Sequence, residues 1–300
     1  MTGWRLAADV GGTNVRFAVS TRPGRLRDIG HFALRDFPSF SAVLRRYLAG
    51  VSQAERPGEA AIAVAGPVIA GTVRMTNAPW AISAHEISEA TGAGDVRLVN
   101  DLEAVARALP ELGAADADVL QEGTRSGDGY RALALNVGTG FGAAGVISHR
   151  GRMVTLASEA GHMAACALTA KGEEAVRAGS VEDVLSGRGV AALYRQMGGE
   201  GTLEAKDVFA RAAFDDSAAK AVLVLSRALG LVSANMVLAH AAWDGVFLTG
   251  SVACGWHRLQ AHAEFLTAFR MAGPMAERLQ ATPIAVITRP DAALFGLSYL

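Results

Sequence analysis

Short apolar runs alternate with amphipathic stretches along the first hundred residues. The runs Leu6–Ala8 and Val15–Val19 flank a glycine turn and predict two adjacent strands. Ser39 and Ser83 are typical N-cap residues, and each precedes a stretch with helical spacing of apolar positions. Further strands are predicted at Ile29–Leu34, Ala60–Ala65, Gly71–Met75 and Val96–Val99, and a helix at Leu102–Leu109. Strands that alternate with helices indicate an α/β fold around a mixed sheet.

The second half repeats this alternation after Gly113–Tyr130, a polar and glycine-rich stretch that we interpret as a surface connection. Strands are predicted at Ala132–Val137, Ala143–Ile147, Met153–Leu156, Gly245–Leu248 and Ile284–Ile287. Helices are predicted at Gly172–Ala178, Val181–Leu185, Gly189–Met197, Ala205–Ala212 and Ser217–Ala239, then in segments to Leu279, and from a cap at Asp291 to Tyr299. The strand–glycine turn–strand unit therefore occurs early in each half, which indicates a duplicated architecture with a boundary near Leu109.

Composition narrows the class of protein. Three hundred residues, 51% of them hydrophobic, are enough for one large or two ordinary domains. The formal charge of −1 gives no basic excess for nucleic acid or an anionic membrane. Two cysteines, Cys166 and Cys254, cannot form a disulfide framework, and the apolar stretch Ala221–Ala242 is interrupted by polar residues and predicts a buried helix. We expect a cytoplasmic protein without a membrane span.

The octapeptide Asp9–Arg16 is the first candidate for chemistry. Gly11 and Gly12 allow positive φ and close approach of backbone N–H groups to an acceptor-rich ligand, while Thr13 and Asn14 add polar groups at the tip. A phosphate cradle with a carboxylate at Asp9 and an ordinary hairpin are equally compatible with this pattern. The chain has no Gly-x-x-x-x-Gly-Lys-Ser/Thr loop and no N-terminal Gly-x-Gly-x-x-Gly, which excludes a P-loop enzyme and argues against a dinucleotide fold.

Acidic and polar residues follow later strands. Asn100 and Asp101 come at the carboxyl end of a predicted strand, where Asp101 is either a base for a substrate hydroxyl or the N-cap of the next helix. Glu159 and His162 share a loop and suit recognition of adjacent hydroxyls, or form a zinc site with Cys166, or are a solvated carboxylate and a satisfied histidine. Glu182 opens a predicted helix and is uninformative alone.

The order of these motifs is more specific than any one of them. Asp-Val-Gly-Gly-Thr-Asn-x-Arg at 9–16 is followed by Thr-Asn-x-x-Trp at 76–80, Asn-Asp-Leu-x-Ala-Val-Ala at 100–106, Gly-Thr-Gly-x-Gly at 138–142, Glu-x-Gly-His at 159–162 and Glu-Asp-Val-Leu-Ser-Gly at 182–187. In this order they resemble the bacterial glucokinases of the hexokinase–actin–Hsp70 ATPase superfamily. The resemblance extends from Leu6 to the final helix.

The resemblance implies a two-domain, ribonuclease-H-like or actin-like fold with the active site in an interdomain cleft. The small domain would comprise 1–109 with 289–300, and the large domain 110–288. The implied reaction is ATP-dependent phosphorylation of the glucose 6-hydroxyl, with Mg²⁺, in a homodimer. Asp101 would be the catalytic base, and the implied sugar contacts are Asn77, Asn100, Asp101, Gly138, Glu159, His162 and Glu182. The implied nucleotide contacts are Asp9, which would hold Mg²⁺ through water, and Gly11, Gly12, Thr13, Asn14, Arg16, Gly138, Thr139, Gly140, Gly250 and Ser251.

The sequence departs from the family pattern in ways that bear on the site. Ser251 stands in place of the second glycine of a pair at the adenosine site, and Ala160 in place of a glycine in the Glu-Gly-Gly-His loop. The cysteine cluster of the related repressor/open-reading-frame/kinase (ROK) family is absent, so no structural zinc is expected. A kinase for fructose, mannose or an N-acetylhexosamine, and a sugar-binding regulator without catalysis, are the alternative functions.

Overall fold

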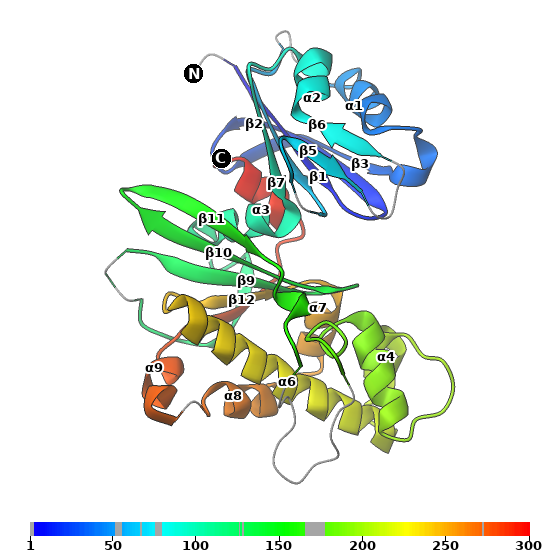
Figure 1. Cartoon of the computed structure of the whole chain (residues 1–300), viewed down its shortest axis with the longest axis vertical. Coiled ribbons are helices and arrows are strands. Elements are labelled where there is room, and N and C mark those ends of the chain that lie inside the picture. The colour runs from blue at the N-terminus through cyan, green and yellow to red at the C-terminus, as the bar shows by residue number, and fades with distance from the viewer. Residues whose placement is uncertain are drawn as a thin grey trace. The chain divides into compact units, whose positions relative to one another are not determined.

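The chain folds into two compact units, seen in the computed structural model of Figure 1. One unit is Met1–Glu111 with Pro290–Leu300, and the other is Leu112–Arg289. The structure describes residues 3–51, 56–66, 68–75, 80–125, 127, 129–165, 178–271 and 273–300. We refer to the units as the N-terminal unit and the central unit.

The N-terminal unit is built on a five-stranded mixed sheet in the order β3-β2-β1-β4-β7. Its strands are β1 (Arg5–Val10), β2 (Asn14–Arg22), β3 (Arg25–Ala33), β4 (Glu59–Val64) and β7 (Asp95–Asn100). β1, β2 and β3 form an antiparallel meander, and β4 and β7 continue parallel to β1. A separate hairpin joins β5 (Thr72–Arg74) to β6 (Ala81–Ser83).

Alternation along β1 divides its side chains between two cores. Leu6, Ala8 and Val10 pack with α1 (Phe40–Leu48) and α2 (Ala84–Thr91), which begin at the predicted caps Ser39 and Ser83. The opposite face is rich in alanine and packs against α3 (Asp101–Ala108) and α10 (Ala292–Leu297). Because successive strand residues point to opposite faces, Asp9 shares this alanine-rich face. Arg16 is its cross-strand partner, so the charged pair lies at the end of a buried surface.

The central unit contains a six-stranded sheet in the order β11-β10-β9-β12-β13-β8. Its strands are β8 (Ala117–Gln121), β9 (Arg131–Val137), β10 (Phe141–His149), β11 (Arg152–Ser158), β12 (Val246–Thr249) and β13 (Ile284–Ile287). β9, β10 and β11 form an antiparallel meander, and β12 and β13 run parallel to β9. The five strands of the N-terminal sheet match the order and orientation of β11-β10-β9-β12-β13, so the expected duplication is seen in the topology, with β8 as an addition.

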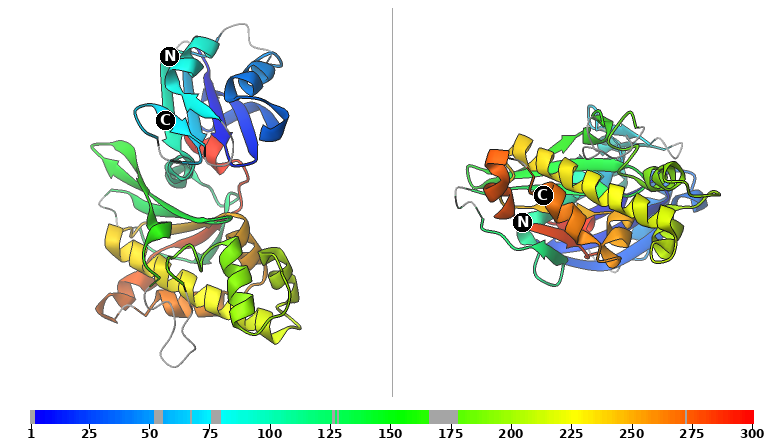
Figure 2. Two further views of the ribbon diagram at one scale, coloured as in Figure 1. Left: turned by 45° about the vertical axis from the view of Figure 1, so that its right-hand side comes forward. Right: turned by 90° about the horizontal axis from the view of Figure 1, so that it is seen from below.

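The helices of the central unit surround a larger core. α6 (Asp216–His240) runs along the sheet (Figure 2), with α4 (Gly187–Gln196), α5 (Ala205–Arg211), α7 (Ser251–Arg258), α8 (His262–Phe269) and α9 (Ala276–Gln280) around it. α6 is long and apolar enough to span a membrane, but 72% of its most apolar window is buried inside the protein. This agrees with the buried helix expected from the sequence.

Three local predictions were wrong. Ala117–Gln121 is an edge strand antiparallel to β13, within the stretch predicted to be only a connection. Val181–Leu185 forms turns, so Glu182 does not begin a helix. Asp291 precedes α10 as predicted, but its side chain makes no capping hydrogen bond. Most of the predicted helix Gly172–Ala178 lies outside the described residues.

Candidate active site

The turn between β1 and β2 places a partly buried ion pair beneath an exposed polar tip. Asp9 retains 7% of its exposure, and its Oδ2 accepts from Nη2 of Arg16 at 2.5 Å. Thr13 and Asn14 are exposed at the tip. Neither Gly11 nor Gly12 adopts a positive φ, so this turn does not use the conformational freedom expected of it. A chain reversal with few side chains still leaves its backbone open to a ligand.

Asn100 and Asp101 have different roles at the start of α3. Asn100 is the N-cap: its Oδ1 accepts from the backbone N–H of Leu102 at 2.9 Å, and Glu103 completes a capping box. Asp101 is the first helical residue, and its Oδ1 accepts from the same N–H at 2.9 Å. The N-cap role that the sequence also allows for Asp101 is therefore filled mainly by Asn100.

Burial raises the pKa of Asp101 above its ordinary value, and the negative charge of Asp9 raises that pKa further. Hydrogen bonds from the backbone N–H of Leu102 and from Asn100 act in the opposite direction but do not cancel the shift. Both carboxylates lie at carboxyl ends of strands, β1 and β7, which are separated in the sheet only by β4. A raised pKa makes Asp101 a stronger base than a solvated aspartate.

The raised pKa of Asp101 has a consequence for stability. Ionising this carboxyl costs more free energy in the folded chain than in the unfolded chain, so the cost is present above the folded pKa. It disappears below the unfolded pKa of about 3.9, where both states are protonated. We therefore expect Asp101→Asn to raise the free energy of unfolding at pH 7, and the gain to vanish as the pH falls towards 3. Urea unfolding at several pH values measures this.

Asp95→Asn is the matched control for that experiment, because Asp95 is an exposed aspartate at the start of β7, the strand that ends directly before Asp101. It should show no comparable gain at pH 7. A stability gain for Asp101→Asn that is the same at pH 3 and pH 7 would contradict the assignment to ionisation.

In the central unit, the turn between β9 and β10 holds the carboxylate of Glu182. The turn is closed by a hydrogen bond from Gly138 N–H to the Gly140 carbonyl at 2.9 Å. Oε2 of Glu182 accepts from the backbone N–H of Phe141 at 2.9 Å, and Oε1 accepts from Nη2 of Arg188 at 2.5 Å. A Cβ on Gly140 would collide with the Glu182 carboxylate. Gly140 is therefore what allows that carboxylate to lie against the turn.

Given the sugar contact that the family resemblance implies for Glu182, we expect Gly140→Ala to weaken glucose binding by about tenfold. The added methyl group would displace the Glu182 carboxylate and break its bond to Phe141, and a hydrogen bond to a charged group contributes about 1.5–3 kcal/mol. Calorimetric titration with glucose measures the effect. Gly145→Ala is the control, because Gly145 lies within β10, outside the predicted contacts, and its Cβ would come no closer than 3.6 Å to the Leu133 side chain, an ordinary contact. Equal losses for both variants would show that displacement of Glu182 is not the cause.

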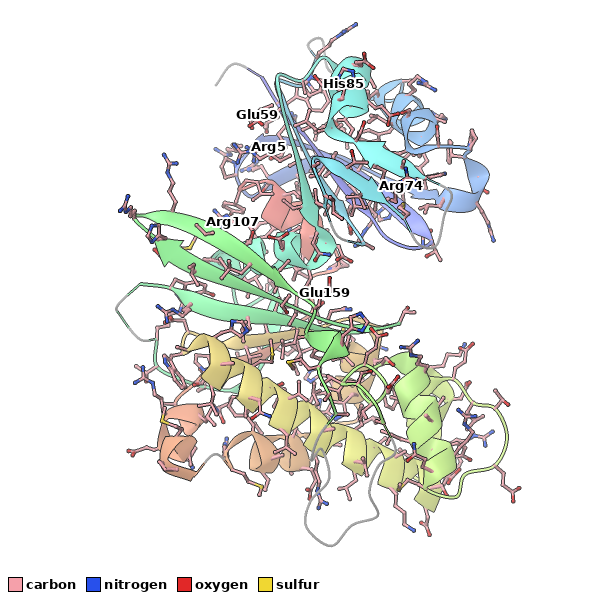
Figure 3. All side chains as sticks on the ribbon, in the orientation of Figure 1. Arg5, Glu59, Arg74, His85, Arg107 and Glu159 are labelled. Atoms are coloured by element: carbon pink, nitrogen blue, oxygen red, sulfur yellow. The ribbon has the colours of Figure 1, made fainter. Side chains whose placement is uncertain are left out.

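Glu159, labelled in Figure 3, directly precedes a short 3-10 helix, Ala160–His162, that follows β11 and ends at His162. The side chains of Glu159 and His162 are 79% and 74% exposed, with Oε2 of Glu159 3.9 Å from Nε2 of His162. The histidine is not the buried, satisfied residue of the alternative interpretation. Ala160 has no positive φ and is buried, so replacement of the usual glycine does not strain the backbone.

A groove of about 940 Å³ opens beside the same turn in the central unit. It is lined by Gly138, Thr139, Gly187, Arg188, Ala191, Leu203, Glu204, Ala205, Lys206, Phe209, Ala210, Ser251, Val252, Gly255, Arg258 and Leu259. Gly250 precedes α7 with φ +97°, and a Cβ there would contact Asn136 and Val137, so glycine is required. Ser251 is the first residue of α7 and has no such requirement.

The predicted site residues form two groups, one in each unit. Asp9, Arg16, Asn100 and Asp101 gather at one edge of the N-terminal sheet, whereas Gly138–Gly140, Glu182 and Ser251 gather around the turn and groove of the central unit. Asn77 and Cys166 lie outside the described residues. Sequence reasoning missed Arg188, Lys206 and Phe209 as groove residues. In the sequence, a single arginine after a Ser-Gly pair does not indicate a binding role, because that role depends on the turn that Arg188 faces.

The residues present fit a magnesium ion that is brought with a nucleotide. Among the described residues, no group of three or more His, Cys, Asp or Glu side chains could hold a metal. Mg²⁺ usually takes only one or two protein carboxylates and fills its shell with phosphates and water. Asp9 can supply one such carboxylate, since Arg16 engages only its Oδ2.

The paired sheets, their glycine turns and the aspartate at a strand end define a sugar kinase of the actin-like ATPase fold. The chain belongs to the glucokinase family, which it matches over residues 6–300. Glucokinases from Ralstonia nicotianae and Caulobacter vibrioides are 34% and 32% identical to it, over 98% of this chain and 93% and 94% of theirs. The ATP-dependent phosphotransferase class expected from the motifs is thereby confirmed.

Solved structures share the fold. A glucokinase from an Antarctic psychrotroph superposes with a TM-score of 0.88 and 27% identity, covering 100% of this chain and 98% of that one. A ROK-family glucokinase from Streptomyces griseus, in complex with glucose and AMPPNP, has a TM-score of 0.63 and 20% identity, covering 99% and 98%. At that identity the second comparison supports the fold only.

Proposed function

We propose that this protein transfers the γ-phosphoryl group of ATP to the 6-hydroxyl of glucose. The observation that carries the proposal is Asp101, a partly buried carboxyl with a raised pKa at the carboxyl end of β7. Asp101 would accept the proton of the 6-hydroxyl as the oxygen attacks the γ-phosphorus in line. The hydroxyl proton moves to the carboxylate, and the bond from phosphorus to the β,γ-bridging oxygen breaks to release ADP.

The other site residues would bind and orient the two substrates. We assign Glu159, His162 and Glu182 to hydroxyls of the sugar, together with Asn77 and Asn100. The Gly11–Asn14 and Gly138–Gly140 turns would present backbone N–H groups to the phosphates, and the groove beside Ser251 would receive the nucleoside. Bound Mg²⁺ would neutralise charge on the phosphates, with Asp9 as its protein carboxylate. Positioning and electrostatics then account for most of the rate enhancement.

We further propose that the enzyme works in the cytoplasm as a homodimer and supplies glucose 6-phosphate to glycolysis. The family and the core position of α6 support a protein outside the membrane. The expectation that it binds neither nucleic acid nor membrane rests on the near-neutral charge. Light scattering on the purified chain would test the dimer.

A panel of sugars in a coupled ADP-release assay tests the activity. We expect glucose to give the highest kcat/KM, with fructose, mannose and N-acetylglucosamine well below it. Preference for one of the other sugars would replace glucose as the substrate. Binding of glucose without release of ADP would favour the sugar-binding regulator instead.

A further inference from the structure

Arg188 joins the groove to a carboxylate that is proposed to bind sugar. It is the second residue of α4 and lines the groove together with Gly138 and Thr139. Its Nη2 lies 2.5 Å from Oε1 of Glu182 and 3.9 Å from Oδ1 of Asp183. The Arg188 side chain is 66% exposed, whereas that of Glu182 is only 21% exposed. The guanidinium therefore contacts a half-buried anion on one side and the open groove on the other.

The position of Glu182 creates an electrostatic conflict with any triphosphate bound at this turn. Its carboxylate accepts from Phe141, the residue directly after Gly140, and lies so close that a side chain on Gly140 would displace it. The same turn is the proposed cradle for phosphates. Two anions would then approach one short segment of backbone from neighbouring directions, and like charges repel.

We propose that Arg188 resolves this conflict and couples the binding of nucleotide to the binding of sugar. A guanidinium carries five N–H donors in a fixed plane, so it can keep its bond to Glu182 while donating to a phosphate oxygen. Arg188 is thus a positioning residue: it holds Glu182 in the orientation presented to the sugar and screens it from the phosphates. This inference rests on the proposed function, because it takes Glu182 as a sugar ligand and the turn as a phosphate site.

Loss of Arg188 should make the two ligands antagonistic. Without the guanidinium, Glu182 would face the phosphates unscreened, and each ligand would weaken the binding of the other by the same factor. Arg188→Lys keeps the charge but presents fewer donors in a less fixed geometry, so it should rescue part of the coupling. A residue with a merely structural role would change the unfolding midpoint. It would leave unchanged the ratio of the glucose affinities measured with and without bound nucleotide.

The test is calorimetric titration of glucose with and without saturating AMPPNP and Mg²⁺. The variants are Arg188→Gln, Arg188→Lys and, as matched control, Arg195→Gln, which alters an exposed arginine on the same helix. We expect AMPPNP to leave glucose affinity equal or tighter in the wild type and Arg195→Gln. We expect it to weaken glucose affinity at least about fivefold in Arg188→Gln. An unchanged ratio of affinities in Arg188→Gln would overturn the inference.

A double-variant cycle identifies the partner. In a Glu182→Gln background, the carboxylate that repels the phosphates is gone. Adding Arg188→Gln should then change the effect of AMPPNP on glucose affinity by less than about twofold. An effect as large as in the single variant would show that Arg188 does not act through Glu182. Activity is measured separately. A wild-type protein that binds both ligands but releases no ADP would overturn the proposed function. The ratio of glucose affinities with and without AMPPNP would still decide the role of Arg188.

Discussion

Asp101→Asn should lower kcat for glucose phosphorylation by about 10²–10⁴-fold, the usual contribution of a positioned general base. Asparagine keeps the acceptor that Leu102 N–H requires but cannot take a proton from the sugar hydroxyl. Glucose affinity should change only a few-fold, because the amide occupies the same space and still forms hydrogen bonds. Steady-state ADP release gives kcat, and calorimetric titration gives the dissociation constant of glucose.

The same residue should set the acidic limb of the pH profile. Because the pKa of Asp101 is raised in the free enzyme, kcat/KM should fall on acidification at a pH above the ordinary range of aspartate. Asp95→Asn should leave both kcat and this limb unchanged. An Asp101→Asn variant with kcat within tenfold of the wild type would exclude Asp101 as the base.

The parts of the fold that could be predicted are those in which local pattern and tertiary burial agree. The runs on either side of Gly11 and Gly138 are buried on both faces, so apolar residues mark them clearly. β8 was missed because it is an edge strand: most of Ala117–Gln121 is at least partly exposed, and its one fully buried residue is the polar Gln121. Edge strands with a solvated face carry little hydrophobic signal.

The error at Val181–Leu185 has a related cause. Val181, Val184 and Leu185 have helical spacing and are buried, yet the segment forms turns that bring Glu182 against the β9–β10 turn. A tertiary contact therefore decides the local conformation. Arg188 escaped notice for the same reason, since its importance depends on a partner that is fixed only when this turn has formed.

Pairwise spacing did not reveal that Arg16 and Asp9 form a partly buried ion pair. The motif and the family resemblance suggested a nucleotide contact for Arg16. In the structure it forms an ion pair with Asp9 and also donates to the carbonyl of Pro290, at the entry to α10. A structural role and a phosphate contact are compatible, because a guanidinium has donors for several acceptors. The sequence alone cannot show how these donors are shared.

Arg16→Gln should therefore destabilise the N-terminal unit by about 2–4 kcal/mol. Removal of one partner of a buried pair typically costs about 3–5 kcal/mol because the other charge stays buried and uncompensated. We expect slightly less here, since the Arg16 side chain keeps 30% of its exposure and Asp9 keeps 10%. Urea unfolding at pH 7 measures the loss, with Arg22→Gln, an exposed arginine on the same strand, as control.

The double variant Asp9→Asn/Arg16→Gln separates charge from packing. With both charges removed, no uncompensated ion remains, so most of the stability lost in Arg16→Gln should return. Activity should not return, because Asp9 is the proposed carboxylate for the nucleotide-bound Mg²⁺. If the double variant is as unstable as Arg16→Gln, then the hydrogen bond to Pro290, and not the charge of Asp9, is what Arg16 chiefly supplies. Restored stability without activity would show that Asp9 and Arg16 both stabilise the fold and both belong to the phosphate site.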